Sequence, residues 1–150
     1  MTDGYQLGLL AAFGTGIVFA FVTVFEGVLG KAMGSVNAAV MEHIFGGLIS
    51  VAVFIFVLTR GAIDLQLARK FLPLAALMGL LVLVAVMGVT FSFPKIGFAT
   101  GNFLLVMAQI STAVIIDAVG VGGFERIPIT IWRVLGFGLM GLGVYFVLPK

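Results

Sequence analysis

Cysteine is absent from this sequence and charged residues are scarce. With no Cys among 150 residues, disulfide cross-links, thiolate nucleophiles and cysteine-ligated metals are excluded. Only 9% of the residues are charged, whereas about a quarter are charged in a soluble domain. So few ionisable groups cannot cover a surface that faces water. The hydrophobic content of 62% and the mean hydropathy of +1.30 indicate that lipid is the solvent.

Motifs of soluble enzymes and of nucleic-acid-binding proteins are also missing. The sequence has no G-x-S-x-G, Walker or H-E-x-x-H motif, and its single histidine, His43, leaves no second imidazole for a catalytic relay. The net charge is +2, but the eight Lys and Arg residues are scattered between apolar runs and form no patch that could bind phosphates. The first thirty residues contain no Lys or Arg, whereas a cleavable signal peptide begins with basic residues. We therefore expect a retained first segment and no enzymatic activity, cofactor or nucleic-acid partner.

Five apolar stretches are long enough to cross a bilayer as helices, which takes about 20 residues each. We predict an all-α integral membrane protein with one five-helix domain over residues 1–150. A short connection at 31–35 makes the first two spans a tight hairpin. Residues 91–95, which include Pro94, are predicted to break the third span, and Pro128 is predicted at the start of the fifth. The predicted spans are about 6–30, 37–59, 71–90, 97–120 and 128–148.

The Lys and Arg residues near the span ends indicate orientation only weakly. Five lie on the amino-terminal side of the membrane and three on the other side, a small bias. A chain with such a bias could insert both ways, and an odd number of spans then permits an antiparallel pair that resembles an inverted-repeat transporter. A single orientation with the amino terminus inside is the alternative. The five are Arg60, Arg69, Lys70, Arg126 and Arg133, and the three are Lys31, Lys95 and Lys150.

Ionisable side chains inside the predicted spans are costly in a membrane, so each is a candidate site residue. Glu26 lies about 6 Å inside the end of the first span, and Glu42 and His43 lie about 8 to 10 Å inside the start of the second. A hairpin brings these depths together, and a carboxylate beside an imidazole could exchange protons near neutral pH. We assign the leading roles to Glu26 and His43. The alternatives are an interfacial pair of Glu26 with Lys31, and a buried Glu42 held by the imidazole or by a backbone donor.

Polar groups on the fourth and fifth spans complete the candidate set. Asn102 and Gln109 are seven residues apart, nearly on one helix face, and are predicted to line the same cavity. Interhelical hydrogen bonding is the alternative. Asp117 and Arg133 lie at the end of the fourth span and the start of the fifth, where we predict a structural salt bridge. One histidine and two carboxylates at no recognised spacing give little support to a metal site, and the methionines are interpreted as apolar filling.

A series of residues in the two carboxyl-terminal spans carries a family resemblance: Pro94-Lys-Ile-Gly97, Gln109, Ile116-Asp117, Gly120, Arg133, Gly136, Gly141 and Gly143. Leu29-Gly30 and Gly34-Ser35 extend it to the amino-terminal half. This pattern resembles the YdcZ-like family of the drug/metabolite transporter superfamily over nearly the entire chain. In that family the first helix usually has a Gln and an Asn where this chain has Val22 and Glu26. The second helix usually has an apolar residue and a Ser in place of Glu42 and His43.

The resemblance implies half of an inverted-repeat bundle and a role in transport. Members of the family occur as antiparallel homodimers, as paired subunits or as fused ten-helix proteins. We therefore expect a multi-pass protein of the bacterial inner (cytoplasmic) membrane that acts as a homodimer. An antiparallel arrangement of the two copies is favoured over a parallel one. Its expected function is exchange or export of a small cationic or zwitterionic compound against protons, with Glu26 binding either the proton or the substrate. A passive dual-topology channel and a helper subunit of another membrane protein remain alternatives.

Overall fold

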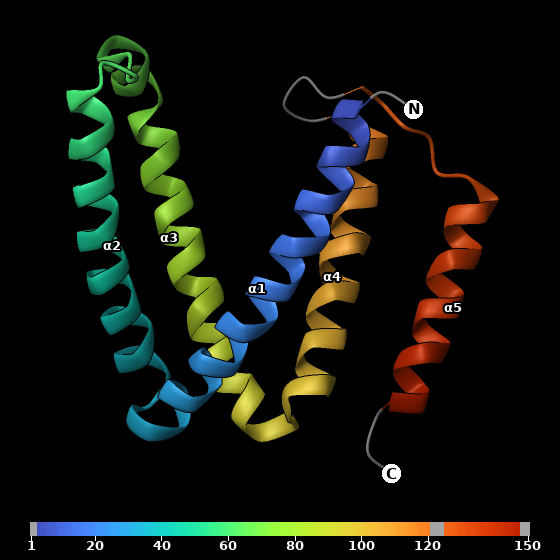
Figure 1. Ribbon diagram of the computed structural model, residues 1–150. Coiled ribbons are helices and arrows are strands. Elements are labelled where there is room, and N and C mark those ends of the chain that lie inside the picture. Colours follow the sequence, from blue (N-terminus) through green and yellow to red (C-terminus); the bar gives the residue numbers. More distant parts are fainter. Residues whose placement is uncertain (1–2, 121–124, 148–150) are drawn as a thin grey trace. The chain divides into compact units, whose positions relative to one another are not determined.

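The computed structural model describes residues 3–120 and 125–147, and all regular structure in these ranges is α-helical (Figure 1). The first four helices are each long and apolar enough to cross a membrane, and the fifth contains a shorter apolar segment, Ile131–Phe146. The predicted all-α membrane architecture of five helices is therefore confirmed. The helices are α1 (Asp3–Met33), α2 (Ser35–Thr59), α3 (Leu65–Ile96), α4 (Phe98–Val119) and α5 (Ile131–Val147).

The third helix differs most from its predicted span. It begins at Leu65, because the Asp64 Oδ1 accepts hydrogen bonds from the backbone N–H groups of Gln66 (2.9 Å) and Leu67 (3.1 Å) and so caps the first turn. It continues to Ile96 with Pro73 and Pro94 inside it. The prediction of a break at residues 91–95 was therefore wrong.

The carbonyl group that Pro94 leaves without its helical hydrogen bond lies against another helix. In an α-helix the N–H of residue 94 would bind the carbonyl oxygen of Thr90. Pro94 has no N–H, and the Thr90 carbonyl group packs instead against Gly30 of α1, where an added Cβ would overlap it. Proline on α3 and glycine on α1 together allow the two backbones to meet.

The remaining boundaries differ from the prediction by a few residues. Gly34 alone separates α1 from α2, so the connection predicted at 31–35 is shorter than expected. Helix α5 starts at Ile131, three residues after Pro128, which precedes the helix rather than opening it. The predicted end of this span at residue 148 lies outside the described residues.

Two helices begin after a glycine with the same unusual backbone conformation. Gly34 precedes α2 with φ 84° and ψ 155°, and Gly97 precedes α4 with φ 82° and ψ 157°. L side chains rarely adopt this positive φ. The same backbone conformation therefore starts two different helices, and each turn depends on the absence of a Cβ.

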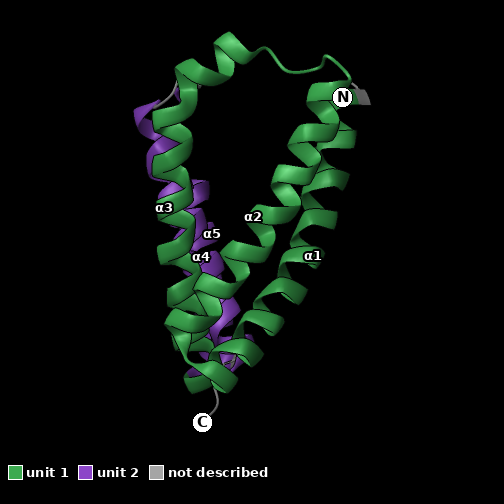
Figure 2. Ribbon diagram, turned by 90° about the vertical axis from the view of Figure 1, so that its left-hand side faces the viewer, with its two compact units in different colours: residues 1–95 green, residues 96–150 purple. Residues whose placement is uncertain are grey.

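The chain divides into two compact units, residues 1–95 and residues 96–150 (Figure 2). In the first unit α1 and α2 pack together and diverge with distance from Gly34 (Figure 1). Helix α3 joins them near the turn, where the Thr90 Oγ1 lies 3.3 Å from the carbonyl oxygen of Ser35 and 2.8 Å from that of Val86. Ala38 and Ala39 of α2 are fully buried. Small residues thus allow close helix packing at this end of the unit.

The second unit consists of α4 and α5, which contact each other and run antiparallel (Figure 1). Gly120 ends α4 in the left-handed conformation, with its N–H donating to the carbonyl oxygen of Ile116 at 2.8 Å. The N–H of Ile127 donates to the carbonyl oxygen of Asp117 at 3.0 Å. These contacts bring the segment before α5 back to the end of α4.

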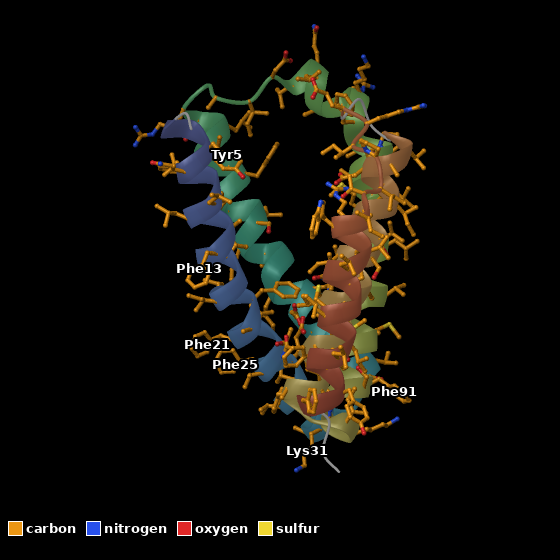
Figure 3. The ribbon with its side chains drawn as sticks, turned by 90° about the vertical axis from the view of Figure 1, so that its right-hand side faces the viewer. Tyr5, Phe13, Phe21, Phe25, Lys31 and Phe91 are labelled. Atoms are coloured by element: carbon orange, nitrogen blue, oxygen red, sulfur yellow. The ribbon has the colours of Figure 1, made fainter. Side chains whose placement is uncertain are left out.

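Aromatic side chains mark the lipid-facing surface. Phe13, Phe21 and Phe25 project from one side of α1 and are 72%, 62% and 63% exposed (Figure 3). Such a stripe suits acyl chains rather than water. At helix ends the Arg60 guanidinium lies 5.1 Å from the ring centre of Phe56, and the Lys95 ammonium lies 2.9 Å from that of Phe91. Basic groups over rings near helix ends are typical of the membrane interface.

Candidate functional site

Glu26 is the buried carboxylate of the first unit. It lies seven residues before the end of α1, about 10 Å along the helix, and its side chain is only 5% exposed. Its Oε2 is fully buried and has no hydrogen-bond partner in the described structure. Thr23, one turn earlier, is fully buried, and its Oγ1 donates to the carbonyl oxygen of Ala20 at 2.9 Å. One oxygen of Glu26 is therefore both buried and without a hydrogen bond from the described residues.

Glu42 and His43 are the ionisable neighbours of Glu26. Both are half-buried on α2, and both lie near enough for their charges to act on the Glu26 carboxylate. No ion pair joins Glu26 to Lys31 among the described residues. The hairpin thus brings one carboxylate of α1 close to a carboxylate and an imidazole of α2.

The hydrogen bond of His43 fixes which ring nitrogen can react. Its Nδ1 lies 2.8 Å from the backbone carbonyl oxygen of Ala39. A carbonyl oxygen only accepts, so Nδ1 must carry the hydrogen and donate it. The Nε2 of the neutral ring is then the nitrogen that can accept a proton or a substrate donor.

A cavity of about 320 Å³ adjoins Glu42 and His43. It lies between α2 and α3, and Ser50 contributes a hydroxyl whose Oγ donates to the carbonyl oxygen of Gly46 at 2.8 Å. Several of the side chains that line it are small and some are polar, and its volume fits a compact molecule. No group of three or more His, Cys, Asp or Glu side chains that could hold a metal occurs in residues 3–120 and 125–147. The lining residues are Glu42, His43, Gly46, Gly47, Ser50 and Val82.

Asn102 and Gln109 of α4 line two separate cavities. Asn102, with Phe103 and Val106, borders a cavity of about 220 Å³, and its Nδ2 donates to the carbonyl oxygen of Phe98 at 3.0 Å. Gln109 borders another cavity of about 370 Å³. The seven-residue spacing placed them on one helix face, but the helix surface between them is not a single cavity.

Asp117 and Arg133 join the facing ends of α4 and α5. The Arg133 Nη2 lies 3.3 Å from the Asp117 Oδ2, and the side chains are 28% and 38% exposed, respectively. The same guanidinium has a second nitrogen, Nη1, that is buried and has no hydrogen-bond partner in the described structure. One side of the guanidinium is thus paired and the other is not.

We expect the Asp117–Arg133 pair to stabilise the second unit. Either Asp117→Asn or Arg133→Gln should lower the folded yield, and the charge-swapped double variant should recover part of it. Because both groups are partly exposed, the coupling should be on the order of 1 kcal/mol or less. Fluorescence-detected size exclusion measures the yield. If Asp117→Asn kept full yield but abolished transport, the pair would belong to the mechanism instead.

Sequence reasoning missed two features of the site region. Thr90 is a buried polar residue of α3, and its Oγ1 reaches the carbonyl oxygens of Val86, Met87 and Ser35. A threonine near the end of an apolar run was the available signal for it. The cavity between α4 and α5 that contains Arg133 had no signal in the sequence, because its walls come from segments that only the fold brings together.

The family comparison agrees with this membrane architecture. The family model described as "Putative inner membrane exporter, YdcZ" matches residues 7–146, which include nearly the full length of all five helices. No curated protein and no solved structure gave a significant match. The match spans most of the chain, and the helices are apolar and long enough to cross a membrane. The chain is therefore a multi-pass inner-membrane protein and belongs to the YdcZ family of inner membrane exporters.

Proposed function

We propose that the protein exports a small cationic or zwitterionic compound in exchange for protons, with Glu26 as the group that binds either of them. The observation that carries this proposal is that the buried Oε2 of Glu26 has no hydrogen-bond partner within residues 3–120 and 125–147. A charged carboxylate inside a membrane costs about 3 kcal/mol on insertion scales. Binding a proton or a cation neutralises it, and the two compete for the same oxygen.

Glu42 and His43 extend the proposed site from Glu26 toward the cavity between α2 and α3. His43 Nε2 is available because Nδ1 is held by the Ala39 carbonyl oxygen. An imidazole with one fixed nitrogen can pass a proton through the other. We propose that Glu42 and His43 bind the substrate or relay the proton, and that Ser50 provides a neutral hydrogen-bonding group in the same cavity.

The proposed active form is a homodimer, with the antiparallel arrangement favoured. Gly46, Gly47 and Ser50 form a small, partly polar face of α2 that is exposed in this chain. A small and polar face is poorly matched to lipid and well matched to a close helix contact. A second copy on this face would enclose the cavity beside Glu42 and His43.

Exchange in proteoliposomes tests the proposed function. The purified protein is reconstituted, a proton gradient is imposed, and uptake of a panel of organic cations and zwitterions is followed together with internal pH. An exchanger moves protons against substrate in a fixed ratio. Substrate flux without proton movement would favour a passive channel, and no flux for any compound would favour a helper subunit.

Antiparallel assembly predicts that each end of the helix bundle is accessible from both sides of the membrane. The natural sequence has no cysteine, so single cysteines at Arg60 and Lys95, both exposed, can be labelled without background. Each should react with an impermeant maleimide both in intact cells and in inside-out vesicles. Lys31→Cys serves as a control that should behave like the Lys95 variant. Labelling of each site from one side only would exclude dual topology and leave a parallel dimer.

A further inference from the structure

The cavity between α4 and α5 has one charged end and an otherwise apolar wall. Its volume is about 320 Å³, and both helices contribute to it. The two lining residues on α4 are four positions apart in the sequence. The four on α5 follow one another at intervals of three, one and three positions, so each set lies on one helix face. None of them is among the candidate transport residues Glu26, Glu42 and His43. The lining residues are Ile110, Val114, Arg133, Gly136, Phe137 and Met140.

The charged end of this cavity lies at the ends of the two helices, and its apolar end lies farther along them. Arg133 is the third residue of α5, and its ion-pair partner Asp117 is the third from the end of α4. Gly136 and Met140 are three and seven residues farther along α5, about 5 and 10 Å deeper. Polarity therefore changes along the cavity in the same direction as along a phospholipid.

The guanidinium has one more donor than its protein partner uses. Nη2 faces the Asp117 Oδ2 at 3.3 Å, whereas Nη1 is buried without a partner in the described structure. Buried donors are normally satisfied, and an arginine fork suits phosphate oxygens. Basic pockets between membrane helices bind anionic lipid headgroups.

We propose that this cavity is a binding site for an anionic phospholipid, with its phosphate on Arg133 Nη1 and the start of an acyl chain along Val114, Phe137 and Met140. Asp117 keeps the guanidinium oriented through Nη2, and Nη1 is the donor left for the headgroup phosphate. Gly136 leaves the space for the acyl chain, since an added Cβ there meets nothing within 4 Å. The site does not depend on the proposed transport function.

Thermal stability of the delipidated protein tests this site. The probes are phosphatidylglycerol, phosphatidylcholine and inorganic phosphate, each added to protein in a neutral detergent, with native mass spectrometry to count bound lipids. A ligand at about 100 times its Kd stabilises enough to raise Tm by about 5 °C or more. We expect this shift, and one retained lipid, with phosphatidylglycerol only.

Three variants separate the site from general lipid effects. Gly136→Leu should fill the cavity and remove the phosphatidylglycerol shift, whereas Gly138→Leu, on α5 with equally open space but outside the cavity, should keep it. Arg133→Lys can still pair with Asp117 but loses the planar fork, so its shift should be smaller than half that of the natural protein. Equal shifts with phosphatidylcholine, an equal shift with inorganic phosphate alone, or a full shift in both Gly136→Leu and Arg133→Lys would each overturn the proposal.

Discussion

Glu26→Gln should abolish proton-coupled exchange and leave the protein folded. The substitution keeps the size and shape of the side chain and removes its charge and its exchangeable proton. Among the described residues Oε2 has no hydrogen-bond partner, so the substitution breaks no hydrogen bond at that oxygen. Exchange flux in proteoliposomes should fall at least tenfold, while size-exclusion profile and yield stay as in the natural protein.

The matched control for this variant is Glu125→Gln. Glu125 is exposed and lies outside the helices, so the same chemical change there should leave flux unchanged. If Glu26→Gln transported like the natural protein, Glu26 would be excluded as the coupling group. Glu42→Gln and His43→Gln would then be tested in the same assay, and wild-type flux in all three would favour the passive channel.

The same competition predicts how substrate binding depends on pH. A cation binds the charged carboxylate and a proton neutralises it, so substrate affinity should fall as pH is lowered through the titration of the site. Binding titrations between about pH 5 and pH 9 measure this. Glu26→Gln should flatten the dependence, because no proton is left to compete. An unchanged pH profile in that variant would assign the competition to another group.

Gly30→Ala should disrupt the packing of α3 against α1 and so destabilise the first unit. A Cβ at this position would overlap the backbone carbonyl of Thr90, and a backbone carbonyl cannot rotate away as a side chain can. Helices α1 and α3 must therefore separate, and overpacking of this kind costs about 1 to 3 kcal/mol or more. The gain of about 1 kcal/mol in helix propensity from glycine to alanine is too small to offset it. We expect a lower Tm and a lower folded yield.

Gly14→Ala on the same helix is the control for Gly30→Ala. Nothing lies within 4 Å of a Cβ built at Gly14, so this variant should be as stable as the natural protein or slightly more stable. Both are compared by size exclusion after heating in the same detergent. Equal stability of the two variants would mean that α1 and α3 do not touch at Gly30 in the membrane.

Both ends of α3 depend on contacts that hydropathy does not describe. Hydropathy predicted the third span to end before Pro94, because proline removes a helix hydrogen bond. The helix nevertheless continues to Ile96, and the carbonyl of Thr90 that Pro94 leaves without a helical N–H lies against Gly30, sixty residues away in the sequence. Asp64 likewise begins α3 six residues before the apolar run, because a helix cap depends on a side-chain oxygen and not on hydropathy.

The sequence by itself determined the membrane environment, the number of helices and the identity of the costly groups inside them. These follow from local composition, because a backbone surrounded by hydrocarbon must satisfy its hydrogen bonds within each segment. Only the tertiary structure decided that, in the part of the chain it describes, Oε2 of Glu26 lacks a hydrogen-bond partner and Arg133 has an unused donor beside an apolar cavity. It also decided that Asn102 and Gln109 line different cavities. Each of these depends on distances of a few ångströms between atoms of different helices or turns, and side-chain periodicity along one helix contains no information about its neighbours.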